Sequence, residues 1–142
     1  MFSFLNAIPD AQAEISGYEM YSDLEGTVLF YGVHGGTIVV ADIRNLPEEN
    51  GFHGFHIHGG NSCKNPGQHY TKGQMLHPNH AGDMPPLLAN DGMAFLVFYT
   101  NRFFPEDIVG KTIIIHEKRD DFTTQPSGDA GEMIGCGEIK LS

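Results

Sequence analysis

The sequence lacks tryptophan and has only eight lysine and arginine residues against 18 acidic ones, which gives a formal net charge of −10. This charge argues against nucleic acid or an anionic membrane surface as a partner, because both attract basic proteins. Long apolar runs are also absent. Residues 1–9 are apolar, but this stretch is short, contains no basic residue and is followed directly by Asp10. We therefore predict no signal peptide and no transmembrane span. The expected location is cytoplasmic if the sequence is complete, or exported if a leader was removed.

Cysteine is scarce as well, because the chain has only Cys63 and Cys136. In a cytosolic protein the usual state of such a pair is two reduced thiols. A bridge between them would close a long covalent loop and would tie the beginning of a glycine-rich loop to the apparent C-terminal strand. The spacing alone leaves both states open.

The short apolar runs, separated by many of the 18 glycines, predict a β-rich fold. With 142 residues the chain is expected to form one domain, residues 1–142. No long amphipathic helix is predicted, and one helical turn is expected after Pro105. Seven or eight short strands would form an antiparallel sandwich or barrel. The strand signals lie at residues 11–19 (weak), 26–33, 37–43, 52–58, 93–99, 111–116 and 133–141.

Residues 59–91 show no periodic pattern and are rich in Gly, Pro, Asn, Lys and His. A loop this long argues against a compact domain unless a function orders it. A bound metal would provide that order, because its binding energy becomes folding energy. Residues 117–132 form a second polar loop.

Six of the eight histidines fall within the 31 positions from His53 to Asp83. Core packing does not require such a cluster, whereas metal binding does, because neutral imidazole is the commonest protein ligand for zinc, copper and related ions. His56 and His58 are two apart in a predicted strand, so both face the same side of the sheet and suit one metal ion.

The loop adds His77, His80 and Asp83, spaced three and three, which supply two nitrogens and one oxygen suited to zinc. His69 could join either group, and a further histidine, His116, ends the apolar run at 111–116. A lone histidine is more often structural, and this simpler interpretation applies to His34 in a hairpin turn and to His53. The pattern predicts metal binding without deciding which metal, or whether the site is catalytic.

The motifs Gly-Phe-His56-Ile-His58, His77-X-X-His80-Ala-Gly-Asp83 and Gly110-Lys-Thr-Ile-Ile-Ile-His116-Glu-Lys-Arg-Asp120-Asp121, with Gly135-Cys136-Gly137, resemble the copper/zinc superoxide dismutase family. The resemblance runs from about residue 26 to residue 139 with the motifs in family order. It implies a Greek-key β-sandwich or flattened barrel of about eight antiparallel strands with two long functional loops. It also implies conversion of superoxide to dioxygen and hydrogen peroxide at a copper ion bridged to zinc.

The resemblance assigns roles residue by residue. The copper ligands would be His56, His58, His69 and His116. The zinc ligands would be His69, which bridges the two metals, and His77, His80 and Asp83. Asp120 would hydrogen-bond to one ligand of each metal. Cys63 and Cys136 would form a disulfide, and His53 would be structural. The partner is the superoxide anion, and a homodimer is among the arrangements that the resemblance allows.

One position departs from the family pattern: Met133 stands where the family carries an arginine that docks superoxide. A thioether offers neither charge nor strong donors. Steering would then depend on Lys118, Arg119 or Lys72, and the expected result is reduced dismutase activity. The alternative function is a protein that stores or buffers copper and zinc on the same scaffold.

Overall fold

A computed structural model describes residues 7–47 and 51–142, and in this part of the chain ten strands are present. The first seven are β1 (Ala11–Gly17), β2 (Glu25–Val33), β3 (Gly36–Arg44), β4 (Gly51–His53), β5 (Phe55–His58), β6 (Leu87–Ala89) and β7 (Ala94–Thr100). The others are β8 (Thr112–His116), β9 (Met133–Glu138) and β10 (Lys140–Leu141). Two short helices complete the list, a 3₁₀ turn at Glu19–Tyr21 and α1 at Pro105–Ile108.

The first hairpin follows the sequence closely. Strands β2 and β3 pair in an unbroken antiparallel register from Glu25 with Arg44 to Val33 with Gly36. The turn between them uses Gly35 at φ 79°, a backbone conformation that glycine adopts without steric cost. The predicted hairpin and the predicted helical turn after Pro105 are both confirmed.

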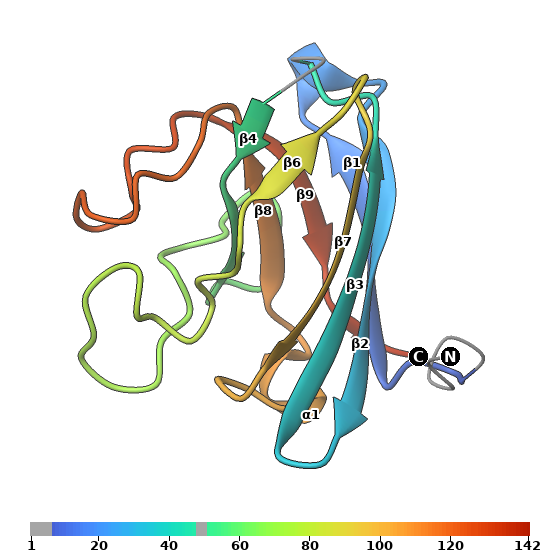
Figure 1. The fold of residues 1–142 in the computed structure, drawn as a ribbon, viewed down its shortest axis with the longest axis vertical. Coiled ribbons are helices and arrows are strands. Elements are labelled where there is room, and N and C mark those ends of the chain that lie inside the picture. The colour runs from blue at the N-terminus through green and yellow to red at the C-terminus, as the bar shows by residue number, and fades with distance from the viewer. Residues whose placement is uncertain (1–6, 48–50) are drawn as a thin grey trace.

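Eight of these strands form one curled antiparallel sheet, in the order β5-β8-β9-β1-β2-β3-β7, with β10 paired to β1, and β4 and β6 form a separate two-stranded sheet. The chain leaves β3, crosses to β4 and β5, and returns so that β7 lies beside β3. This non-sequential order is the predicted Greek-key arrangement, and the all-β sandwich or flattened barrel is confirmed. Figure 1 shows the loops at residues 59–86 and 117–132 projecting from the same side of the barrel.

Alternating strand residues fill the barrel. Phe30, Phe55 and Phe103 are among its largest fully buried side chains. On β8 the inward residues are Ile113 and Ile115. Since residues two apart share a face, the neighbours of these core residues point to the loop side of the sheet. This alternation determines where the histidines of β5 lie.

Three details of the predicted elements are wrong. The predicted strand at 52–58 is divided at Gly54 into β4, which pairs with β6, and β5, which pairs with β8. The region 59–91 contains a short strand, β6, whose three residues are too few to show a periodic pattern in the sequence. The predicted strand at 133–141 is also divided, into β9 and β10.

A disulfide joins Cys63 in the first loop to Cys136 in β9, as the resemblance implied. Cys136 is buried, and the Cα atoms are 5.9 Å apart. The bond attaches the beginning of the loop to the strand beside β8. No helix in the described part of the chain has the length and apolar character needed to cross a bilayer.

The disulfide spans a sequence separation of 73 residues, so the loop-entropy relation predicts a stabilisation of up to about 4 kcal/mol. Replacing Cys63 and Cys136 together by serine is expected to lower the free energy of unfolding by an amount approaching this value. Urea denaturation of both proteins measures the difference, with reduced wild-type protein as the control. Equal midpoints for the oxidised wild type and the serine variant would contradict the prediction.

Candidate metal centre

Strand β5 supplies two histidines on one face. Phe55 and Ile57 point into the core and are fully buried. His56 and His58 point to the opposite face, where they are also buried, and lie across from Ile114 and Thr112 of β8. The alternation predicted from the sequence therefore brings both imidazoles to the loop side of the sheet.

The first loop is hydrogen-bonded along the free edge of β5. Ile57 N–H donates to the carbonyl of Gly82 at 2.8 Å, and Tyr70 N–H donates to the carbonyl of Ile57 at 2.8 Å. Only glycine fits at position 82, because a Cβ atom there would lie 2.3 Å from the Ile57 carbonyl oxygen. Short antiparallel bridges consequently place Asp83 beside His56 and His69 beside His58.

Four imidazoles converge at this edge. His56, His58, His69 and His116 each offer one ligand atom, and these atoms lie within 4.8 Å of one another. His116 comes from the end of β8, which pairs directly with β5. All four side chains are buried. The histidine that the sequence left isolated therefore joins the loop and strand histidines in space.

A second group gathers around the carboxylate of Asp83. His69 Nδ1 lies 2.7 Å from Asp83 Oδ1, while His77 Nδ1 and His80 Nδ1 lie 3.1 Å and 3.0 Å from Asp83 Oδ2. His69 belongs to both groups, with its ring centroid 4.1 Å from that of His56 and 5.5 Å from that of His80. His56, His69, His77 and Asp83 also present ligand atoms within 4.8 Å of one another.

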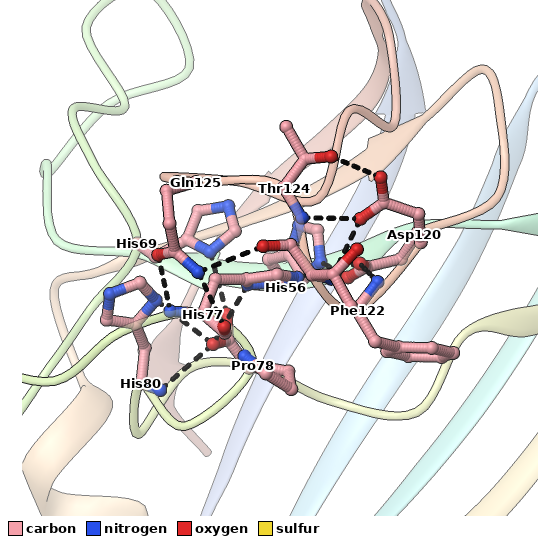
Figure 2. A network of polar contacts seen from close by, with 12 residues as sticks. His56, His69, His77, Pro78, His80, Asp120, Phe122, Thr124 and Gln125 are labelled. Carbon is pink, nitrogen blue, oxygen red and sulfur yellow. Dashed lines mark hydrogen bonds and ion pairs between the residues drawn. The ribbon is translucent and has the colours of Figure 1, made fainter.

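Asp120 connects the two groups from the second loop. Its Oδ2 accepts a hydrogen bond from His56 Nε2 at 2.6 Å, and its Oδ1 accepts one from His77 Nε2 at 2.7 Å, as Figure 2 shows. These bonds leave Nδ1 of both rings available for a metal. Gly128 packs over this carboxylate so closely that a Cβ atom at 128 would lie 2.0 Å from Asp120 Oδ1.

Gln125 is a contact that the sequence did not predict. Its Oε1 accepts from the backbone N–H of His77 at 2.9 Å, and its Nε2 donates to the carbonyl of the same residue at 2.8 Å (Figure 2). The amide thus fixes the backbone at His77 and joins the two loops. A lone glutamine in a polar loop carries no spacing signal that identifies such a role.

The hydrogen bonds at the other nitrogens hold the remaining rings. His58 Nδ1 donates to the carbonyl of Gly67 at 2.8 Å, and His116 Nδ1 donates to the carbonyl of Gly131 at 3.1 Å. A hydrogen bond from one ring nitrogen to a carbonyl orients an imidazole ligand and determines which tautomer is present. His53 Nδ1 donates to the carbonyl of His116 at 2.9 Å, which agrees with the structural role predicted for it.

The nitrogens left over fit a pair of metal ions. Among the described residues, seven buried histidine nitrogens have no hydrogen-bond partner. One is Nε2 of the structural His53, and the other six belong to the rings of the two groups: His56 Nδ1, His58 Nε2, His69 Nε2, His77 Nδ1, His80 Nδ1 and His116 Nε2. Buried polar atoms in proteins are almost always paired, so such a set requires an explanation. A cation that accepts these lone pairs provides one, since nitrogen and carboxylate donors suit zinc and copper.

The electrostatics favour neutral imidazoles and charged carboxylates. Burial lowers the pKa of His58 to about 3 and that of His116 to about 4, and neighbouring histidines act in the same direction. Burial opposes ionisation of Asp120, but hydrogen bonds from His56 and His77 hold its pKa below the usual value. Neutral imidazole is the form that binds metal, so the site is ready to do so at neutral pH.

All the predicted ligand positions lie in one region, whereas His34 lies in the hairpin turn beyond β2. Both groups contain His69, the residue for which the resemblance implied a bridging role. His80 enters the second group through its contact with Asp83, and His56 lies close enough to reach both groups.

Residues 24–139 match the family model described as copper/zinc superoxide dismutase. Relatives named superoxide dismutase [Cu-Zn] include one from Legionella pneumophila, which is 32% identical over 81% of this chain and 77% of its own length. Superoxide dismutase [Cu-Zn] 3 from Arabidopsis thaliana is 31% identical over 77% of each protein.

A solved structure supports the same relationship. The crystal structure of a double mutant of a SOD-like protein from Bacillus subtilis has a TM-score of 0.78 and 25% sequence identity to this chain. The match covers 92% of this chain and 97% of that protein.

Replacing Asp120 by asparagine is expected to weaken metal binding by about 10–100-fold at the group whose histidine loses its acceptor. An amide has one acceptor oxygen and one NH₂ donor, so either His56 or His77 loses its acceptor. Metal dissociation constants from chelator competition measure the effect. Asp121→Asn is the matched control, because Asp121 is partly exposed and accepts hydrogen bonds from the backbone N–H groups of Thr123 and Thr124. Equal losses in the two variants would contradict the prediction.

Proposed function

Because the chain belongs to the copper/zinc superoxide dismutase family, we propose that it dismutates superoxide to dioxygen and hydrogen peroxide with one copper and one zinc ion. The copper ligands in this proposal are the four histidines that converge at β5: His56, His58, His69 and His116. The zinc ligands are those around Asp83: His69, His77, His80 and Asp83 itself. The main support is His69, which belongs to both groups: its Nε2 has no hydrogen-bond partner among the described residues, and its Nδ1 lies 2.7 Å from Asp83.

Bound copper supplies a one-electron redox couple, and bound zinc supplies positive charge without redox chemistry. One superoxide is oxidised to dioxygen, and a second is reduced to peroxide with the uptake of two protons. His69 Nε2 is the proposed proton carrier, as in the family, because it is free of protein partners among the described residues. With copper bound, this nitrogen would hold one proton and pass it to the peroxide product. Solvent supplies the second proton.

Asp120 and the carbonyls of Gly67 and Gly131 keep the other rings in place while His69 changes its protonation state. Their hydrogen bonds fix the nitrogen that stays away from the metal in each ring. Preorganised groups of this kind avoid reorganisation during the reaction.

The approach of the anion is the unusual part of this site. Met133 lies across from His116 in the β8–β9 pairing, next to a register shift at Ile115 and His116. Lys72 forms an ion pair with Asp107 at 2.9 Å, so its charge is largely neutralised by that carboxylate. Lys118 lies against Gly131, but the carboxylate of Glu117 approaches the same glycine. Lys72 and Lys118 therefore offer little net attraction, and we propose reduced steering of superoxide.

The function is tested by metal analysis together with a dismutase assay on protein loaded with copper and zinc. We expect dismutation that depends on copper. His58→Ala is expected to abolish it and to lose copper while zinc is kept, whereas His34→Ala leaves both unchanged. Wild-type protein that binds both metals without dismutating superoxide would instead support the storage or buffering function.

Met133→Arg is expected to raise kcat/KM about tenfold at low ionic strength, because focused charge raises the on-rates of charged substrates by roughly 10 to 10³, an effect known for this family. The gain should shrink as salt is added. Met93→Arg is the matched control, since Met93 is half-exposed just before β7 and its replacement gives the same change in charge. A Met133→Arg rate no higher than that of Met93→Arg at low salt would contradict reduced steering.

A further inference from the structure

Arg102 follows β7, and contacts with the barrel fix the backbone at this residue and at the next one. Its backbone N–H donates to Thr100 Oγ1 at 3.1 Å. The next residue, Phe103, is 1% exposed, and its ring centroid lies 6.1 Å from that of Phe30. The carbonyl of Phe103 accepts a buried hydrogen bond from Thr37 Oγ1 at 2.7 Å. The base of the Arg102 side chain therefore has a fixed position relative to the core.

The guanidinium of Arg102 reaches the backbone of the first loop. Its Nη1 donates to the carbonyls of Pro78 at 2.8 Å and His80 at 3.0 Å, and approaches that of Asp83 at 3.3 Å. These carbonyls belong to the segment that carries three of the proposed zinc ligands, His77, His80 and Asp83. Hydrogen bonds from a charged donor are about twice as strong as neutral ones, so this contact is a firm attachment.

The attachment is needed because this segment has no regular structure of its own. Residues 59–86 contain turns and isolated bridges but no strand or helix. By contrast, three of the four convergent histidines lie on strands β5 and β8, which pair directly. The geometry around Asp83 thus depends on loop contacts far more than the four-histidine group does.

We propose that Arg102 is a positioning residue that holds His77, His80 and Asp83 in their zinc-binding arrangement and thereby sets the zinc affinity. The inference rests on the proposed zinc site. Arg102 touches carbonyl oxygens of the loop, so it acts through the backbone. A ligand set arranged before the metal arrives loses less conformational freedom on binding, and this raises affinity.

The test compares zinc and copper dissociation constants of the metal-free full-length chain by chelator competition. Arg102→Met keeps an unbranched side chain and removes the donors, and we expect it to weaken zinc binding about 10–100-fold. Copper binding should change by much less. Arg44→Met is the matched control with the same change in charge. Arg44 is exposed at the end of β3, where its Nε lies 3.7 Å from Asp42 Oδ1, and its replacement should alter the affinity for neither metal.

Two further readouts separate positioning from general stability. Cobalt(II) bound in place of zinc reports ligand geometry through its visible spectrum, which should change in Arg102→Met and stay unchanged in Arg44→Met. Arg102→Lys keeps a charged donor without the fork geometry, so its zinc affinity should fall between those of the wild type and Arg102→Met. If Arg102→Met does not fold, a selective loss of zinc affinity in Arg102→Lys supports the proposal.

The outcomes are distinguishable. Wild-type protein that binds no zinc would overturn the proposed function together with this inference. Wild-type protein that binds zinc while Arg102→Met binds it equally well would overturn the positioning role alone. Zinc and copper affinities that fall in the same proportion would also overturn it, because the effect would then be a general loss of stability.

Discussion

The whole centre depends on the hydrogen bonds along the free edge of β5. Without the bonds from Ile57 to Gly82 and from Tyr70 to Ile57, the loop would not follow this strand, and His69 and Asp83 would not lie beside its two histidines. An unpaired strand edge normally invites association with another chain. Here the loop pairs with it, so one set of backbone bonds both closes the sheet edge and assembles the ligands.

That assembly has a cost that metal binding offsets. A buried polar atom without a partner costs roughly 1–3 kcal/mol, and the six histidine rings keep one such nitrogen each in the described part of the chain. Burial lowers the pKa of His58 to about 3 and that of His116 to about 4, so protonation does not satisfy these two rings at neutral pH. Coordination is thus the favourable way to satisfy the lone pairs, and it stabilises the fold as it does so.

The features that could be predicted from the sequence are those with a periodic pattern or a local cluster of one residue type. The β2–β3 hairpin was readable from alternation and glycine, and the histidine cluster from its density, although the pairing of His116 with the cluster came from a family resemblance. The break at Gly54 was not readable, because β4 and β5 are continuous in sequence and differ only in which strand they join. Nor were Gln125 and Arg102, because both bind backbone carbonyls or N–H groups, and backbone atoms leave no mark in the sequence.

The register of β5 against β8 also has a consequence for the order of assembly. The ligands around Asp83 lie between His69 and Asp83, within one continuous stretch of chain. The four-histidine group requires His56 and His116, which meet only when β8 has paired with β5. Contacts between distant residues form later, because a larger loop must be closed first. During synthesis all the ligands of the proposed zinc site are made before β8 exists, but Asp120 and Gln125, which hold His77, follow β8. The proposed zinc site can therefore begin to form early and is completed later, whereas the proposed copper site cannot begin to form until β8 has paired with β5.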